Sequence, residues 1–146
     1  MRQFRYRLAG LARFQKSSLQ PLRHALQEAE HRLEANRAAM RAAEEDVSSC
    51  ERTLPALVGN QTLYLAALNF IRELRLRCRQ LAHIVEDSER LREQAMAVLL
   101  EAQARLRQLE KHEERQRALW KAEIQRGEYR DQDDAWLQRR MAGELA

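Results

Sequence analysis

The residues whose side chains could bind a metal or take part in catalysis are four histidines and two cysteines, His24, His31, His83, His112, Cys50 and Cys78. A zinc hydrolase needs H-E-x-x-H, with two histidines one helical turn apart and a glutamate as general base. The run that starts at His112 reads H-E-E-R and lacks the second histidine, and the cysteines fit no zinc spacing. The glycines are isolated and no G-x-S-x-G occurs. We therefore expect no enzyme, no metal site and no cofactor.

Arginine is the other residue type that could form a functional surface. Residues 1–27 contain no acidic residue, and their six cations are Arg2, Arg5, Arg7, Arg13, Lys16 and Arg23. Phe4, Tyr6 and Phe14 are interspersed among them, which is typical of a basic amphipathic helix for an anionic partner or membrane surface. A transit peptide has a similar composition. A nucleic-acid reader needs a denser basic block, so no nucleic acid is expected as partner.

Helices must position these residues, because the chain is rich in Ala, Leu, Glu, Arg and Gln and has only four Gly and two Pro. Between Leu19 and Leu57, eleven of twelve positions spaced alternately by three and four are apolar. This 3.5-residue period predicts a left-handed coiled coil. The positions are 19, 22, 26, 29, 33, 36, 40, 43, 47, 50, 54 and 57. Asn36, the polar member, either fixes the register of the coil or faces solvent.

Two weaker apolar rows follow, and ten of their sixteen positions are apolar. One row runs from Leu74 in steps of seven to Glu123, and the other runs from Cys78 to Gly127. Pro55 and the pair Gly59-Asn60 predict a break near residues 55–62. Upstream, the first seam is expected to include Phe4, Leu8 and Leu11, and Pro21 predicts a bend or a serine-capped restart near residues 17–21.

The predicted fold is all-α, a long antiparallel two-helix coiled-coil hairpin that forms one domain over residues 1–146. We expect helix one at about 3–54, a turn segment at about 55–72 and helix two at about 62–140, capped by Thr62 and with a frayed tail. Cys50 and Cys78 are expected to be small apolar residues of the core. No apolar stretch is long enough to span a membrane, so membrane insertion is not expected.

Two sets of apolar residues have two possible roles. Trp120, Tyr129 and Trp136 lie in a highly charged stretch and form either exposed protein-binding anchors or a cap against Phe4, Tyr6 and Phe14. Phe70 and Leu74 are four residues apart and share a helix face. They belong either to the core near the turn or to a small docking patch.

These elements together resemble the small coiled-coil stalk proteins of bacterial type III export, the flagellar FliJ family and the injectisome YscO family. The elements are Phe4-Arg5-Tyr6-Arg7-Leu8, the heptad helix 19–54, Tyr64 with Phe70-Ile71-x-x-Leu74, and the charged tail from Trp120 through Arg126, Glu128 and Asp134 to Arg139-Arg140. Pro21 departs from the unbroken first helix expected in that group.

The resemblance implies a cytoplasmic antiparallel two-helix coil, associated peripherally with the inner-membrane export apparatus and acting as a monomer. Its ends would enter the pore of a hexameric export ATPase and promote its assembly and activity. The mid-chain pair, Phe70 and Leu74, would dock on the cytoplasmic domain of the export gate, and export chaperones would be further partners. The arginines for the ATPase ring would be Arg2, Arg5, Arg7, Arg13, Arg126, Arg130, Arg139 and Arg140.

Two rival functions remain open at this point. One is a generic coiled-coil scaffold or tether, and the other is a basic-helix binder of nucleic acid or membrane surfaces. The sequence does not separate the flagellar branch of the family from the virulence branch.

Overall fold

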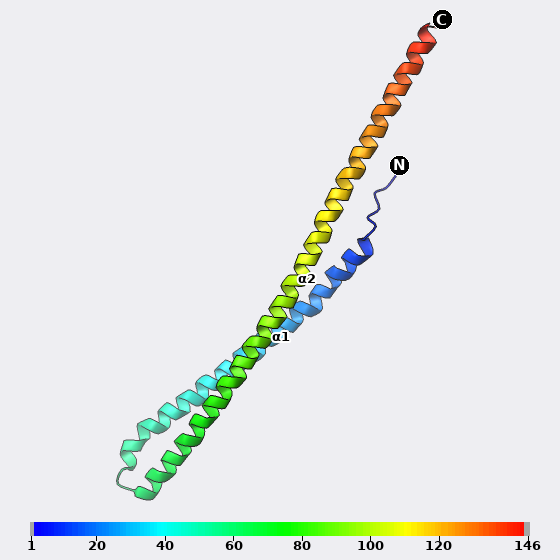
Figure 1. Ribbon diagram of the computed structural model, residues 1–146. Helices are drawn as coiled ribbons and strands as arrows, with labels where there is room; N and C mark the ends of the chain where they lie inside the picture. The colour runs from blue at the N-terminus through cyan, green and yellow to red at the C-terminus, as the bar shows by residue number, and fades with distance from the viewer. Residues whose placement is uncertain (1, 145–146) are drawn as a thin grey trace. The chain divides into compact units, whose positions relative to one another are not determined.

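The computed structural model describes residues 2–144, and in that range it contains helices and no strand. Two α-helices, α1 (Ala9–Thr53) and α2 (Gln61–Glu144), are joined by the short 3-10 helix η1 (Leu54–Leu57). The two long helices run antiparallel and pack against each other (Figure 1). The expected all-α helical hairpin is therefore confirmed.

The first helix begins at Ala9, later than the expected start near residue 3, and residues 2–8 are not helical. Its first turn contains no acidic residue. Arg2, Arg5 and Arg7 stand just before it, and cations at this end oppose the helix macrodipole. Extension of α1 through residues 2–8 would therefore add little to the stability of the helix.

The connection between the helices is shorter than the predicted segment 55–72, and α2 continues past residue 140 to Glu144. Pro55 lies at the start of η1, where a missing N–H costs nothing. The amide of Asn60 donates to the carbonyl of Leu57 at 3.0 Å. The side-chain oxygen of Asn60 in turn accepts from the amide of Leu63 at 3.3 Å. Asn60, and not Thr62, therefore caps α2.

Proline 21 does not interrupt the first helix, because α1 is continuous through it. The hydroxyls of Ser17 and Ser18 donate to the carbonyls of Phe14 and Gln15, at 2.9 Å and 2.8 Å, so neither serine caps a new helix. The predicted restart is therefore wrong. Pro21 is exposed, and water can satisfy the carbonyl that its missing N–H leaves without a partner.

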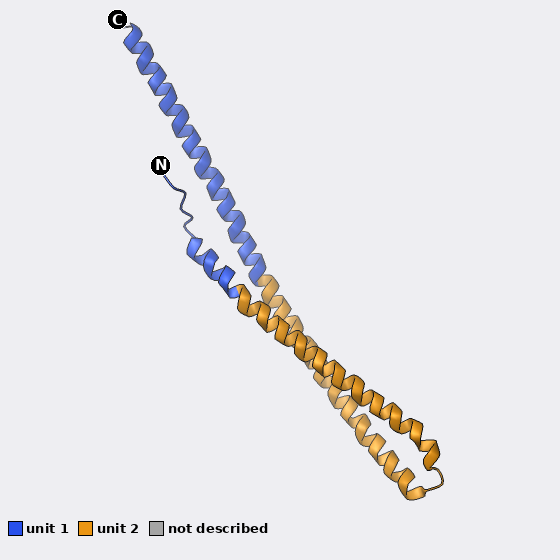
Figure 2. Cartoon of the chain, turned by 180° about the vertical axis from the view of Figure 1, so that it is seen from behind, with its two compact units in different colours: residues 1–18, 102–146 blue, residues 19–101 orange. Residues whose placement is uncertain are grey.

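The chain divides into two compact units, shown in Figure 2. The terminal unit comprises residues 2–18 and 102–144 of the described chain, and the turn unit comprises residues 19–101. Each unit holds a part of α1 and a part of α2. The turn unit also contains the connection.

The covered side chains follow the predicted seam closely. All twelve positions from Leu19 to Leu57 are buried or half-buried, and every other residue in that stretch is exposed. Leu19, Leu33 and Ala43 are 5% exposed, and Ile71 of α2 is 3% exposed. All members of the two α2 rows are also covered except Gln116 and Glu123. The residues that follow the 3.5-residue period therefore form the buried face of both helices.

Within α1, the predicted seam fails only near the start of the helix. Leu11 is 45% exposed, whereas Ala12 is half-buried. The spacing of three and four that leads back from Leu19 passes through Gln15, Ala12 and Leu8, all of which are half-buried. The seam therefore keeps one phase through the proline, and the larger side chain at position 11 lies outside it.

Asn36 lies in the seam and bonds to the other helix. Its amide nitrogen donates to the hydroxyl oxygen of Ser88 at 2.6 Å. The Ser88 hydroxyl donates to the carbonyl of Ile84 at 2.8 Å, and Ser88 is 8% exposed. The polar layer is thus internally bonded. Of the two interpretations of Asn36, the structure favours register fixing, because a paired Asn in a coiled-coil seam disfavours other alignments.

Candidate functional site

The terminal unit holds the candidate protein-binding site, and its first component is the extended segment 2–8. The ring of Phe4 packs against that of Trp120, with centroids 5.7 Å apart and an interplanar angle of 54°. The guanidinium of Arg117 lies 5.2 Å from the centroid of the Phe4 ring. An aromatic pair and a cation–π contact therefore fix this segment on α2 without helical hydrogen bonds.

Tyr6 provides a second attachment of the same segment. Its hydroxyl donates to the carbonyl of Leu109 at 3.3 Å and lies 2.7 Å from Nδ1 of His112. The Tyr6 and His112 ring centroids are 5.6 Å apart. The two attachments leave Arg5, which lies between them, and Arg7, which follows Tyr6, exposed.

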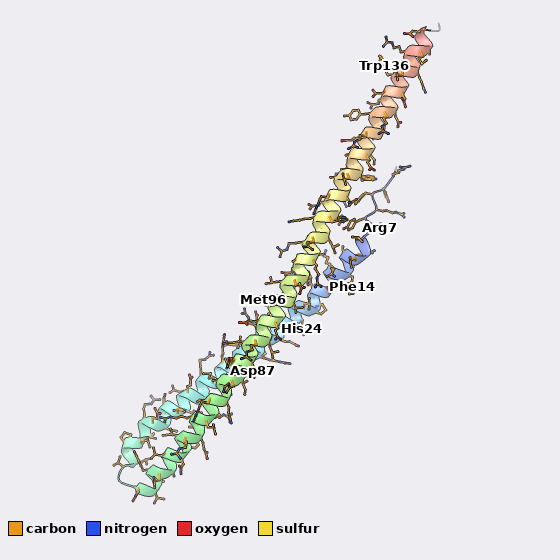
Figure 3. The ribbon with its side chains drawn as sticks, in the orientation of Figure 1. Arg7, Phe14, His24, Asp87, Met96 and Trp136 are labelled. Atoms are coloured by element: carbon orange, nitrogen blue, oxygen red, sulfur yellow. The ribbon has the colours of Figure 1, made fainter. Side chains whose placement is uncertain are left out.

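The aromatic residues of the tail divide into packed and exposed members. Trp120 is half-buried under Phe4, as the capping alternative predicted. Tyr129 is 66% exposed and Trp136 is 56% exposed, as the anchor alternative predicted. Phe14 is 66% exposed and takes no part in a cap. Figure 3 shows Trp136 on a stretch of α2 that has no second segment of the terminal unit beside it.

The predicted ring-contacting arginines are all exposed; they are Arg2, Arg5, Arg7, Arg13, Arg126, Arg130, Arg139 and Arg140. Of these eight arginines, Arg140 alone makes an ion pair within residues 2–144, to Glu144 at 3.6 Å. Its guanidinium also lies 5.2 Å from the centroid of the Trp136 ring. Arg139 donates to the carbonyl of Ala135 at 3.3 Å. The others have no hydrogen bond or ion pair in the described chain, so their charges are available to a partner.

The distal part of α2 brings several of these residues onto one face. Arg126, Tyr129, Asp133, Trp136 and Arg140 follow each other in steps of three and four, and all are exposed. Such spacing aligns side chains along one side of a helix. We call these five residues the distal stripe.

Not every predicted residue belongs to the stripe. Arg130 lies beside it, one residue from Tyr129, and Arg139 lies about a quarter turn away, given 3.6 residues per helical turn. The sequence already contained the signal for the stripe, since its spacing can be read without a structure. The sequence contained no local signal for Arg117 or His112. These two residues contact Phe4 and Tyr6 because segment 2–8 is not helical and lies against α2.

The predicted gate-docking pair lies in the turn unit, and its two members differ. Phe70 is 52% exposed, whereas Leu74 is half-buried in the seam, one turn beyond the buried Ile71. Three further large apolar residues near the turn are exposed, Val58 at 71%, Leu63 at 52% and Leu65 at 53%. Phe70 thus belongs to an exposed apolar group, and Leu74 contributes to the packing of α1 on α2.

Cys50 and Cys78 are free and half-buried on the seam. Within residues 2–144, no three side chains of His, Cys, Asp or Glu gather closely enough to hold a metal ion. Within the same residues, no helix combines the length and the apolar content that crossing a membrane requires.

No family model, known protein or solved structure matches the chain.

Proposed function

We propose that this protein is the central stalk of a bacterial type III export ATPase, a protein that binds the hexameric ATPase ring and promotes its assembly and activity. One observation carries the proposal. The terminal unit presents arginines without partners on a fixed extended segment, together with a stripe of arginine and aromatic side chains that α1 does not cover.

The chemistry of these surfaces suits a protein partner that carries acidic loops. Arg2, Arg5 and Arg7 are held near α2 by the contacts of Phe4 and Tyr6, so less side-chain and backbone freedom is lost on binding. Exposed charges of this kind raise the association rate and select the partner. Tyr129 and Trp136 supply the apolar contact area that binding hot spots need.

Contact with the cytoplasmic domain of the export gate would involve the turn unit. Phe70 is the accessible member of the predicted pair, and Val58 and Leu63 extend the apolar surface near the turn. We propose that these three residues dock there and that Leu74 supports them through the seam. In this proposal the protein acts at the cytoplasmic side of the inner membrane and also contacts export chaperones.

The test is ATP hydrolysis by a purified export ATPase from the same organism, with and without this protein. We expect stimulation that is lost when residues 1–13 or residues 127–146 are removed. Far-UV circular dichroism of each truncated protein must show the helical content expected for the residues that remain. A folded full-length protein that neither binds nor stimulates the ATPase contradicts the proposal and favours a generic scaffold.

A further inference from the structure

In the turn unit, the exposed apolar side chains of α2 gather on one side of the helix. In heptad notation, positions a and d form the seam, position g lies beside d, and position c lies beside g. With Ile71 at position a, five of the eight large apolar residues of α2 that are exposed in this unit occupy position g. These five, which are between 45% and 55% exposed, are Leu63, Phe70, Ile84, Leu91 and Val98. A helix with apolar residues at a, d and g is typical of a bundle with more than two helices.

On the same side of the hairpin, α1 carries small residues. With Leu19 at position a, four exposed alanines occupy positions g and c of α1; they are Ala25, Ala35, Ala39 and Ala42. From the Asn36–Ser88 contact, Ala39 is three residues further along α1 and Ile84 is four residues back along α2. The helices are antiparallel, so Ala39 and Ile84 lie within about one helical rise of each other. We call the g and c positions of both helices in the turn unit the g/c face.

The g positions of the two helices are not joined by an ion pair in the described chain, unlike the e positions on the other side of the seam. At the e positions, Arg75 of α2 pairs with Glu51 of α1. At the g positions, Asp46 is ten residues beyond Asn36 and Arg77 is eleven residues before Ser88, which places them at nearly the same level. Asp46 and Arg77 are exposed, and neither makes an ion pair in the described chain. Their charges are therefore available to a partner.

The g/c face is acidic, although the chain as a whole is basic. Its c positions carry four acidic residues and no basic one, and its g positions carry one aspartate and two arginines. The net charge of the face is therefore −3, whereas that of the chain is +4. The acidic residues are Glu28, Asp46, Glu73, Asp87 and Glu101, and the arginines are Arg32 and Arg77. Such a face attracts a basic partner and repels an anionic membrane or a second copy of itself.

We propose that the g/c face binds a basic amphipathic helix of the export gate's cytoplasmic domain, which lies along the hairpin from Phe70 to Val98. This inference rests on the proposed contact of Phe70 with the gate, and it extends that contact over about 40 Å of α2 at 1.5 Å per residue. The docked helix is the third helix of a three-helix bundle. Its apolar stripe packs on the large side chains of α2 and approaches α1 closely at the alanines. Lysines and arginines beside that stripe meet the carboxylates of the c positions.

The area of the g/c face suits a complex that forms and dissociates. The five large side chains at position g contribute about 400 Å², if a fully exposed side chain of this size has about 150–200 Å². The docked helix buries a similar area, and the alanines and the polar margins bring the total to roughly 1,000–1,200 Å². Interfaces of this size are typical of transient complexes.

The first test measures the dissociation constant of the full-length protein for the purified cytoplasmic domain of the export gate from the same organism. Leu91→Gln keeps a good helix former but removes apolar contact 21 residues away from Phe70, and it should weaken binding about tenfold or more. Leu100→Gln is the matched control, because Leu100 is 51% exposed and lies at position b, on the other side of α2. The control should bind like the wild type. Far-UV circular dichroism should show the same helicity for both variants.

The second test changes charge alone. Asp87 lies at position c between Ile84 and Leu91, and its exposed ion pair with Arg90 at 3.8 Å adds little to stability. Asp87→Lys should weaken binding several-fold at low salt, mainly through slower association, and the effect should shrink at high salt. Glu93→Lys makes the same kind of charge reversal at an exposed position b and should leave binding nearly unchanged.

Unchanged binding of Leu91→Gln, or an equal loss in Leu100→Gln, overturns the inference. If Phe70→Ala weakens binding and Leu91→Gln does not, the contact ends near the turn and the proposed docking of Phe70 stands without the extended face. A wild-type protein that does not bind the gate overturns both. A mass near twice 17.2 kDa in light scattering that Leu91→Gln reduces to 17.2 kDa assigns the face to a second copy and also overturns the inference.

The stalk function is tested separately, because its proposed contacts with the ATPase ring lie in the terminal unit. Leu91→Gln should stimulate the export ATPase as fully as the wild type does. A loss of stimulation in this variant alone contradicts the assignment of the g/c face to the gate. Gate binding that depends on Leu91, without stimulation by either protein, contradicts the stalk function and leaves the inference standing.

Discussion

The polar layer formed by Asn36 and Ser88 allows a sharp test of how the two helices are held together. Replacing Ser88 by Ala removes the acceptor of the Asn36 amide. Asn36 is half-buried, so water reaches the amide only in part. A lost hydrogen bond with one partner left unsatisfied costs about 1 kcal/mol under these conditions. We therefore expect Ser88→Ala to lower the free energy of unfolding by that amount.

Replacing Asn36 by Leu should have a different effect, although it breaks the same hydrogen bond. The Ser88 hydroxyl keeps its bond to the carbonyl of Ile84, so no donor is left without a partner. The new leucine is half-buried in the seam, which contributes up to about 1 kcal/mol of apolar burial. Asn36→Leu should therefore leave the stability unchanged or raise it.

The assay is urea unfolding followed by far-UV circular dichroism, applied to both single variants and to the double variant. Once Asn36 is a leucine, Ser88→Ala should cost almost nothing, so the double-mutant cycle should give a coupling of about 1 kcal/mol. Ser49→Ala, at an exposed position of α1, should change nothing. Additive effects of the two substitutions, or a clear loss of stability in Asn36→Leu, would refute the reasoning.

Three further predictions concern the proline, the helix cap and the residues near the turn. Pro21→Ala should raise the free energy of unfolding by up to about 3 kcal/mol, because it restores a helical N–H inside α1; an unchanged urea midpoint would contradict this. Asn60→Ala should cost about 1 kcal/mol in the same assay, while Thr62→Ala should cost nothing. Phe70→Ala should keep the full stability and weaken binding to the cytoplasmic domain of an export gate, whereas Leu74→Ala should destabilise the hairpin by about 1–2 kcal/mol; equal stability effects would rule out this division of roles.

The periodic part of the fold could be predicted from the sequence, and its ends could not. Twelve positions at alternating steps of three and four specify one face of a helix, whatever the partner is, so the seam from Leu19 to Leu57 was predicted correctly. The error at Leu11 arose because leucine is the larger apolar residue. Extension of the same steps back from Leu19 selects Ala12, whose coverage the structure confirms.

The candidate site was predictable in its residue types but not in its pairing. Both arginine groups and the three tail aromatics were identified from the sequence. Which aromatic is packed depends on where segment 2–8 lies, and the segment lies along α2 because its arginines disfavour the first turn of a helix. Contacts such as Phe4 with Trp120 join residues that are distant in sequence and follow no period.

The most direct test of the stalk function is neutralisation of the N-terminal arginines without removal of the segment that holds them. In the variant Arg2→Gln, Arg5→Gln and Arg7→Gln, the contacts of Phe4 and Tyr6 with α2 remain. The control neutralises three arginines of the turn unit that are exposed and form no ion pair in the described chain, Arg23, Arg72 and Arg79. We predict that the first variant no longer stimulates the export ATPase, whereas the control stimulates it fully. Equal stimulation by both variants would contradict the claim that the terminal unit engages the ATPase ring through its arginines.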